Sequence, residues 1–173
     1  MGLGPFGDIG PCQIYWNDTA IASLLEGGAT FRFTGSVSPD VKEAEFGNTP
    51  LDGIFTGYEQ VEFEAPFTRL TYANLAKIIP GASNSGGESG NVAVFAHQIV
   101  GASLVGAASE LIVKRIVSGV VDTSQKYWLH IPLAYPIPQF DIPYNLNDQR
   151  GFMVLFKCYA NETTGLVWHV GDH

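Results

Sequence analysis

Turn-forming residues divide this chain into short apolar runs, and no other feature limits its fold as strongly. Its 173 residues include 20 glycines and 10 prolines. Both residues interrupt helices, and the runs between them are rich in the β-branched and aromatic side chains that favour strands. They predict eight or nine strands, at residues 13–16, 20–25, 30–37, 58–65, 92–100, 110–121, 126–133, 152–159 and 166–170. We therefore expect a mainly β chain, a sandwich or closed barrel, that forms a single domain over residues 1–173.

Helical spacing occurs in one place. Leu75 and Ile78 follow Thr71 at roughly helical spacing, and Pro80–Gly81 ends the run. Threonine is a favoured N-cap, so we expect one short helix beside the strands. The serine- and glycine-rich residues 82–90 that follow have the composition of a flexible surface loop.

Four prolines are spaced along residues 132–144. Proline cannot donate an N–H group to a strand ladder, so we expect this segment to be a sheet edge, an extended loop or an arm that faces a partner, and not a central strand. The candidate arm residues are Pro136, Pro138, Phe140 and Pro143. The glycine-rich residues 1–12 form a second candidate arm.

The chain is acidic, with 9 Lys and Arg against 17 Asp and Glu and a net charge of -8. This balance argues against a protein that binds nucleic acid through its phosphates, because such binding needs clustered cations. Residues 40–64 alone contribute -6, with seven acids against Lys42. Residues 40–53 fit no EF-hand spacing, so we expect an acidic, solvated loop there.

Polar and apolar residues alternate over residues 58–65 within this acidic stretch. Successive strand side chains point to opposite faces. Glu62 and Glu64 should therefore share a solvent-facing side, while Val61 and Phe63 share a packed side. Glu59 has the opposite parity to the other two glutamates.

The sequence contains no convincing catalytic motif. No serine lies in a nucleophile elbow, and the four histidines (His97, His130, His169 and His173) are not spaced as metal ligands. Cys12 and Cys158 are expected to be buried free thiols. We therefore predict neither an enzyme nor a bound metal or cofactor, although an active site built from scattered residues remains an alternative.

A membrane location is also not expected. Residues 92–109 carry no charge, but polar residues such as His97 and Gln98 interrupt them, and charges follow from Glu110. The first residues have neither the basic nor the apolar part of a signal peptide, so nothing there indicates secretion.

Aromatic residues allow a second interpretation. Trp16, Tyr127, Trp128 and Trp168 could form a platform on which a sugar stacks, which would make the chain a glycan-binding β-sandwich. The alternative is that they fill the core or a subunit interface, as aromatic residues in β proteins usually do.

Residues 46–62, Phe-Gly-Asn-Thr-Pro-Leu-Asp-Gly-Ile-Phe-Thr-Gly-Tyr-Glu-Gln-Val-Glu, carry a resemblance to a known family. Together with the glycine-rich start, the helix at 70–82, Pro-Leu-Ala-Tyr-Pro at 132–136, the turn at 144–148 and the closing pair 152–159 and 166–171, they resemble the tail tube (major tail) proteins of long-tailed bacteriophages. The likeness spans nearly the whole chain.

This resemblance implies a β-sandwich or barrel with a flanking helix and long inter-subunit loops or arms, six copies of which form a ring. Stacked rings would make a hollow conduit for the genome, assembled in the host cytoplasm and located in the virion. Its partners would be further copies and other tail proteins at the tube ends, while DNA would pass without specific binding. The candidate inter-subunit loop comprises Phe46, Gly47, Thr49, Pro50, Leu51 and Asp52.

A conduit should repel phosphates weakly, because attraction would retain the DNA. Glu62 and Glu64, and with less support Glu59, are therefore the candidates for the lumen, and the alternative is that they face outer solvent. Another virion component, such as a baseplate, tail-completion or head-fibre protein, remains an alternative to the tube subunit.

Overall fold

The computed structural model describes residues 11–21, 23–24, 28–38, 52–68, 71–79, 81–86, 92–96, 100–139 and 152–171. This part of the chain is mainly β with a single α-helix, as the sequence predicts. Its strands are β1 (Cys12–Trp16), β2 (Thr19–Ala20), β3 (Ser23–Leu24), β4 (Thr30–Val37), β5 (Phe55–Thr68), β6 (Ala82–Gly86), β7 (Val92–Ala96), β8 (Ser109–Val117), β9 (Val120–Val121), β10 (Leu129–Gln139), β11 (Phe152–Tyr159) and β12 (His169–Val170). The helices are α1 (Tyr72–Ile78) and two short 3-10 turns, η2 (Val105–Ala107) and η3 (Gln125–Tyr127).

Ten of these strands form one antiparallel sheet. Neighbouring strands follow the order β2-β1-β8-β10-β11-β5-β3, and β4, β9 and β12 branch from β5, β8 and β10. β1 also contacts β3, so the two ends of the sheet approach each other. The strands β6 and β7 form a separate hairpin beside α1.

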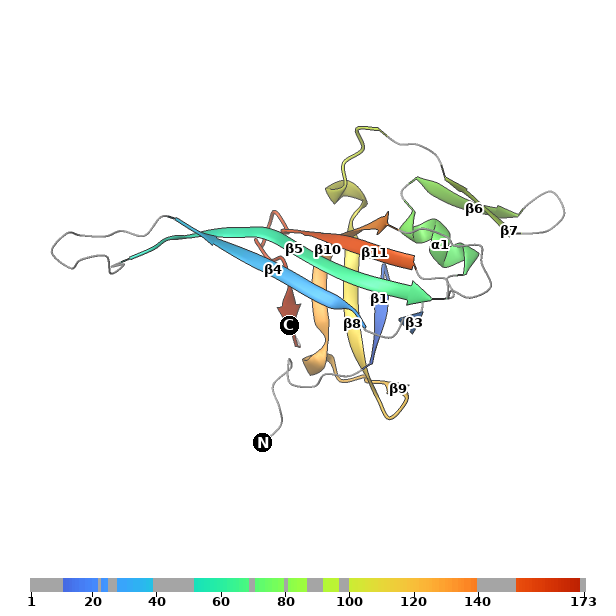
Figure 1. Ribbon diagram of the computed structural model, residues 1–173, viewed down its shortest axis with the longest axis horizontal. Helices are drawn as coiled ribbons and strands as arrows, with labels where there is room; N and C mark the ends of the chain where they lie inside the picture. The colour runs from blue at the N-terminus through green and yellow to red at the C-terminus, as the bar shows by residue number, and fades with distance from the viewer. Residues whose placement is uncertain are drawn as a thin grey trace.

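The large sheet bends over itself and encloses the core. In Figure 1, β5 and β11 run across the direction of β1, β8 and β10. Trp16 on β1 spans this bend, because its Nε1 donates to the carbonyl oxygen of Ala134 (3.0 Å) while its ring contacts Phe156 on β11. The bend buries apolar residues from five strands and α1, among them Ile14, Phe63, Phe67, Ile78, Leu111, Ile131, Val154 and Phe156. Each fully buried side chain of this size contributes about 1.5–3 kcal/mol to the hydrophobic driving force.

The helix forms where its N-cap was predicted. The hydroxyl of Thr71 accepts a hydrogen bond from the backbone N–H of Asn74 (3.2 Å), which satisfies one free donor of the first turn. The Asn74 amide then donates to the carbonyl oxygens of Ala20 and Ile21, and Ile78 is fully buried. These contacts join α1 to the sheet beside β2.

The loop predicted for residues 82–90 is wrong over residues 82–86, which form β6. This strand pairs in register with β7, from Ala82 opposite Ala96 to Gly86 opposite Val92. Ladder bonds use only backbone groups, so a partner strand can order a serine- and glycine-rich segment that has little strand preference of its own.

Residues 132–139 of the proline-rich segment belong to β10. The expectation that this segment avoids a central strand is wrong up to Ala134, where β10 lies between β8 and β11, whereas in the described chain residues 135–139 pair with β11 alone and form a sheet edge, which was one of the predicted alternatives. Pro136 lies opposite Phe156 of β11 and is fully buried, so it is not an exposed arm residue, and Pro138 lies opposite Val154. The prolines occupy positions where a missing backbone N–H is tolerated. Pro132 lies where the register with β8 shifts, and the ladder with β8 ends at Ala134, so no bond to β8 is lost beyond it. The other two predicted arm residues, Phe140 and Pro143, lie outside the described residues.

Candidate functional site

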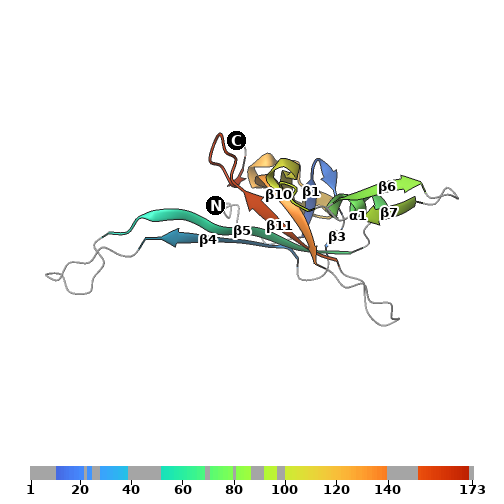
Figure 2. The same ribbon diagram turned by 90° about the horizontal axis from the view of Figure 1, so that it is seen from above.

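A two-stranded ribbon projects from the body of the molecule. It consists of β4 and the first half of β5, and it extends far to one side in both views (Figures 1 and 2). β11 pairs with β5 only over residues 62–67, so within the described chain residues 55–61 pair with β4 alone. At the tip, Ser38 donates its N–H to the Ile54 carbonyl oxygen (2.7 Å), and its Oγ accepts from the Ile54 N–H (3.0 Å). These two bonds join the two strands of the ribbon at its tip.

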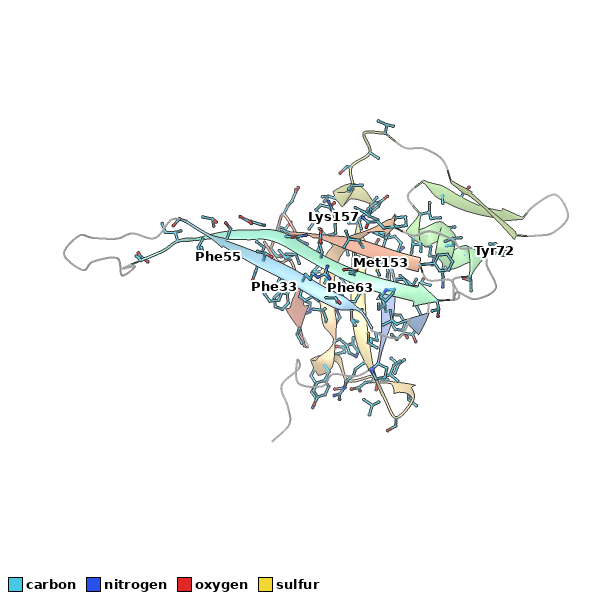
Figure 3. The ribbon with its side chains drawn as sticks, viewed as in Figure 1. Phe33, Phe55, Phe63, Tyr72, Met153 and Lys157 are labelled. Carbon is cyan, nitrogen blue, oxygen red and sulfur yellow. The ribbon has the colours of Figure 1, made fainter. Side chains whose placement is uncertain are left out.

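Aromatic side chains form a continuous row along this ribbon. Ring contacts connect Phe55 to Tyr58 (5.4 Å between centroids), Tyr58 to Phe33 (6.1 Å) and Phe33 to Phe31 (5.5 Å), and Trp168 packs against both Phe31 and Phe33. We call Phe31, Phe33, Phe55 and Tyr58 the aromatic row. Figure 3 shows Phe33 and Phe55 following one another outward from Phe63.

The aromatic row continues the core face of the sheet into solvent. Phe31 and Phe33 lie opposite Phe63 and Val61, both buried, yet Phe33 is 48% exposed. Farther out, Tyr58 is 47% and Phe55 is 56% exposed. A Cβ at Gly35 would lie 2.7 Å from the Phe55 ring, so this glycine makes room for the ring on the opposite strand. Exposed aromatic surface of this extent, on an element that leaves the body, is typical of an interaction site.

The opposite face of the ribbon carries charges of both signs. Glu62 and Glu64 share this face, as the alternation predicted. Arg32 on β4 and Lys157 on β11 lie directly opposite Glu62 on its two sides, and Arg32 Nη1 is 2.6 Å from Glu64 Oε2. Side chains of directly opposed residues share a face. The two glutamates and two cations, which we call the charged face, therefore balance in formal charge.

Glu59 is separated from the other two glutamates by a β-bulge. Gln60 lies opposite Thr34 but Tyr58 lies opposite Gly35, so Glu59 is the extra residue on β5. It is exposed. Gln60 instead extends the charged face, because its amide donates to Glu62 Oε2 (2.6 Å).

Only one residue of the predicted inter-subunit loop is described. Asp52 is exposed, and its Oδ1 accepts a hydrogen bond from the Gly53 N–H (2.8 Å) at the tip of the ribbon. The other five, Phe46, Gly47, Thr49, Pro50 and Leu51, lie outside the described residues, as do residues 1–10 of the predicted N-terminal arm; Cys12 starts β1 instead.

Two histidines that are distant in the sequence come together at the β10–β12 pair. His130 lies opposite His169, and their rings stack with 4.8 Å between centroids. Trp128 stacks on His130 at 5.8 Å, and Glu110 Oε1 is 3.1 Å from His130 Nδ1. No local signal could have predicted this pair, because it depends on the register of two strands. Across the described residues, no three His, Cys, Asp or Glu side chains gather as metal ligands.

A corner of the body combines cations with aromatic rings. Lys114 Nζ lies 3.8 Å from the Trp128 ring centroid and 4.3 Å from that of Tyr15. Arg115 lies over the Tyr127 ring (3.6 Å), and Lys126 Nζ is 4.7 Å from the same ring. We call these three cations and three rings the basic corner. It lies around the β8–β9 hairpin, whose turn uses Ser118 and Gly119 at positive φ.

The tryptophans are engaged by protein groups, which weighs against a sugar platform. Trp16 is buried, Trp168 packs against Phe31 and Phe33, and Trp128 contacts both Lys114 and His130. Stacking of a sugar requires an open ring face.

Both cysteines are free and half-buried. Burial raises the pKa of the Cys12 thiol. Burial, and then the nearby Glu62 carboxylate, raise the pKa of the Cys158 thiol to about 12. Each thiol is therefore neutral and a poor nucleophile at neutral pH.

No known protein-family model matches the chain, and no curated protein matches it significantly. In the described residues, every helix is too short or too polar to cross a membrane. The class that fold and surface define is thus a mainly β protein with a projecting aromatic ribbon.

Proposed function

We propose that this chain is a structural virion protein, the subunit of stacked hexameric rings that form the tail tube of a long-tailed bacteriophage. The tube is a hollow conduit through which the genome passes, and other tail proteins close its two ends. The proposal rests on the sequence resemblance over residues 46–62 and the later segments. It gives the chain no catalytic role.

The observation that supports this role best is the aromatic row. In a monomer, extending the core face beyond the body adds little hydrophobic stabilisation, because Phe33, Phe55 and Tyr58 remain half exposed to water. A subunit whose ribbon packs on a neighbour buries these rings. A whole aromatic side chain buries about 150–250 Å², so these half-exposed rings can add roughly half of that area each to an interface.

The sheet edge supports the same role. Within the described chain β4 pairs only with β5, so the backbone groups of alternate residues along this eight-residue strand are unpaired at its outer edge. Long exposed edges promote association, and a ring satisfies them by pairing with the next subunit. Ring closure then leaves no free edge at which the chains could aggregate.

The charged face suits contact with passing DNA. Its two glutamates and two cations balance, which avoids the clustered positive charge that would hold phosphates. In this proposal Glu62 and Glu64 lie on the lumen side of the ring.

Electron microscopy and sedimentation of the purified chain at rising concentration test the proposal. We expect uniform hollow rings, then tubes, for the wild type. Phe55→Ser should abolish them, whereas Val100→Ser, which removes an apolar side chain that is 86% exposed away from the ribbon, should not. Both variants should retain the wild-type free energy of unfolding within about 0.5 kcal/mol, because both sites are exposed.

A chain that stays monomeric at every concentration contradicts the proposal. A closed particle without a channel would instead favour another virion component, since β-sandwiches serve several positions in a virion.

A further inference from the structure

The basic corner gathers an unusual share of the positive charge of this acidic protein. The described residues include six Lys and Arg, and three of them (Lys114, Arg115 and Lys126) lie in the corner. Asp122 is bound to Arg115 and so compensates one of the three. Counted formally, three cations and one carboxylate leave the corner with two positive charges, in a chain whose net charge is -8.

The corner is built rather than accidental. Lys114 is held between the rings of Tyr15 and Trp128. The Asp122 carboxylate accepts hydrogen bonds from the backbone N–H of Ser124 (2.9 Å) and from the guanidinium of Arg115. The same guanidinium lies over the Tyr127 ring. The hydrogen bonds from Ser124 and Arg115 lower the pKa of Asp122. Three rings thus fix the positions of the cations, which reduces the entropy that binding a ligand would cost.

The best match for this surface lies in the same sequence. Residues 40–52 contain four acids (Asp40, Glu43, Glu45 and Asp52) against Lys42, and one aromatic residue, Phe46. Complementary charge steers association and sets its register, and aromatic side chains are favoured contacts at an interface.

The ribbon tip, from which the acidic segment continues, and the basic corner lie at different places on the molecule. The acidic segment follows Ser38 and precedes Ile54 in the sequence, and these two residues are hydrogen-bonded to each other at the tip of the ribbon. Figure 1 places that tip to the left of the body and β9, next to the corner, at the bottom. A head-to-tail contact of this kind uses two different patches, and such contacts build rings or stacks.

We propose that the basic corner of one copy binds the acidic segment 40–52 of a second copy, with Lys114 and Lys126 facing its carboxylates. This inference rests on the proposed function, because it names the surface that receives the projecting ribbon of a neighbouring subunit. The contact weakens with salt, since its charges are only partly shielded from solvent.

Cross-linking between isotope-labelled chains tests the pairing. Light and heavy full-length chains are mixed, assembled and treated with a carbodiimide, which joins a lysine amine to a carboxylate as an amide with loss of water. Mass spectrometry should find light–heavy peptides that link Lys114 or Lys126 to Asp40, Glu43, Glu45 or Asp52. Links confined to single chains, or light–heavy links only at other places, overturn the inference.

Charge reversal supplies the matched control. Lys126→Glu should weaken association about tenfold, and mixing it with Glu43→Lys chains should restore it. Lys77→Glu makes the same charge change at an exposed position of α1 and should leave association unchanged. Rings that form unchanged with Lys126→Glu contradict the inference but leave the proposed function intact. Specific cross-links in particles that are not rings contradict the function alone, and a monomer without mixed links overturns both.

Discussion

Arg32 and Glu64 form an ion pair diagonally across the β4–β5 ladder, with 2.6 Å between Nη1 and Oε2, although the residue directly opposite Arg32 is Glu62. Lys157 lies opposite Glu62 on the other side, from β11. Each glutamate of this face thus has a cation on a neighbouring strand. The charge that looks one-sided along β5 is balanced across the sheet.

The first prediction concerns the strength of this pair. Arg32 is 59% and Glu64 27% exposed, so solvent screens the attraction. A double-mutant cycle with Arg32→Ala and Glu64→Ala should give a coupling energy of about 0.2–1 kcal/mol in urea unfolding at low salt. High salt should reduce the coupling. A coupling that is absent at low salt, or that does not change with salt, contradicts the pairing.

The second prediction concerns the proposed lumen. Assembled Glu62→Lys particles should retain short DNA at low salt and release it as salt increases, because the charged face becomes positive. Glu162→Lys makes the same charge change on an exposed turn outside the charged face and serves as the control. Equal retention by the two variants, measured by co-sedimentation, would place Glu62 outside the lumen.

The third prediction concerns the core. Phe156 is fully buried, and its ring contacts Trp16 across the bend of the sheet and Phe63 directly opposite on β5. Phe156→Ala should lower the free energy of unfolding by about 3–5 kcal/mol and weaken the near-ultraviolet circular dichroism of Trp16. Val100→Ala, at an exposed site, should change the free energy of unfolding by less than about 0.5 kcal/mol. A small loss at Phe156 would contradict the packing of β11 against β1.

The fourth prediction concerns pH. Folding raises the pKa of Cys158 from 9.0 to about 12, so the folded state favours the neutral thiol. This contribution to stability is complete below pH 9 and is lost as pH rises from 9 to about 12. Between pH 7 and pH 10 the wild type should lose roughly 1 kcal/mol more unfolding free energy than Cys158→Ala, measured by urea titration. Parallel losses in the two proteins would contradict a buried thiol at this position.

Features that depend on neighbours along the chain were predicted correctly. Thr71 starts the helix because its hydroxyl reaches an N–H three residues later. Val61 and Phe63 pack while Glu62 and Glu64 face the other way, because a strand alternates its side chains regardless of its partners. The mainly β character follows from the same local preferences.

Features that depend on which strands meet were not predictable from the sequence. Pairing with β7 makes residues 82–86 a strand, and the end of the β8 ladder at Ala134 lets Pro136 lie buried in the part of β10 that pairs with β11 alone. Register alone brings His169 beside His130 and places Arg32 and Lys157 on either side of Glu62. Local chemistry determined how each segment behaves by itself, whereas the tertiary structure decided its neighbours, because backbone pairing joins residues distant in sequence without requiring particular side chains.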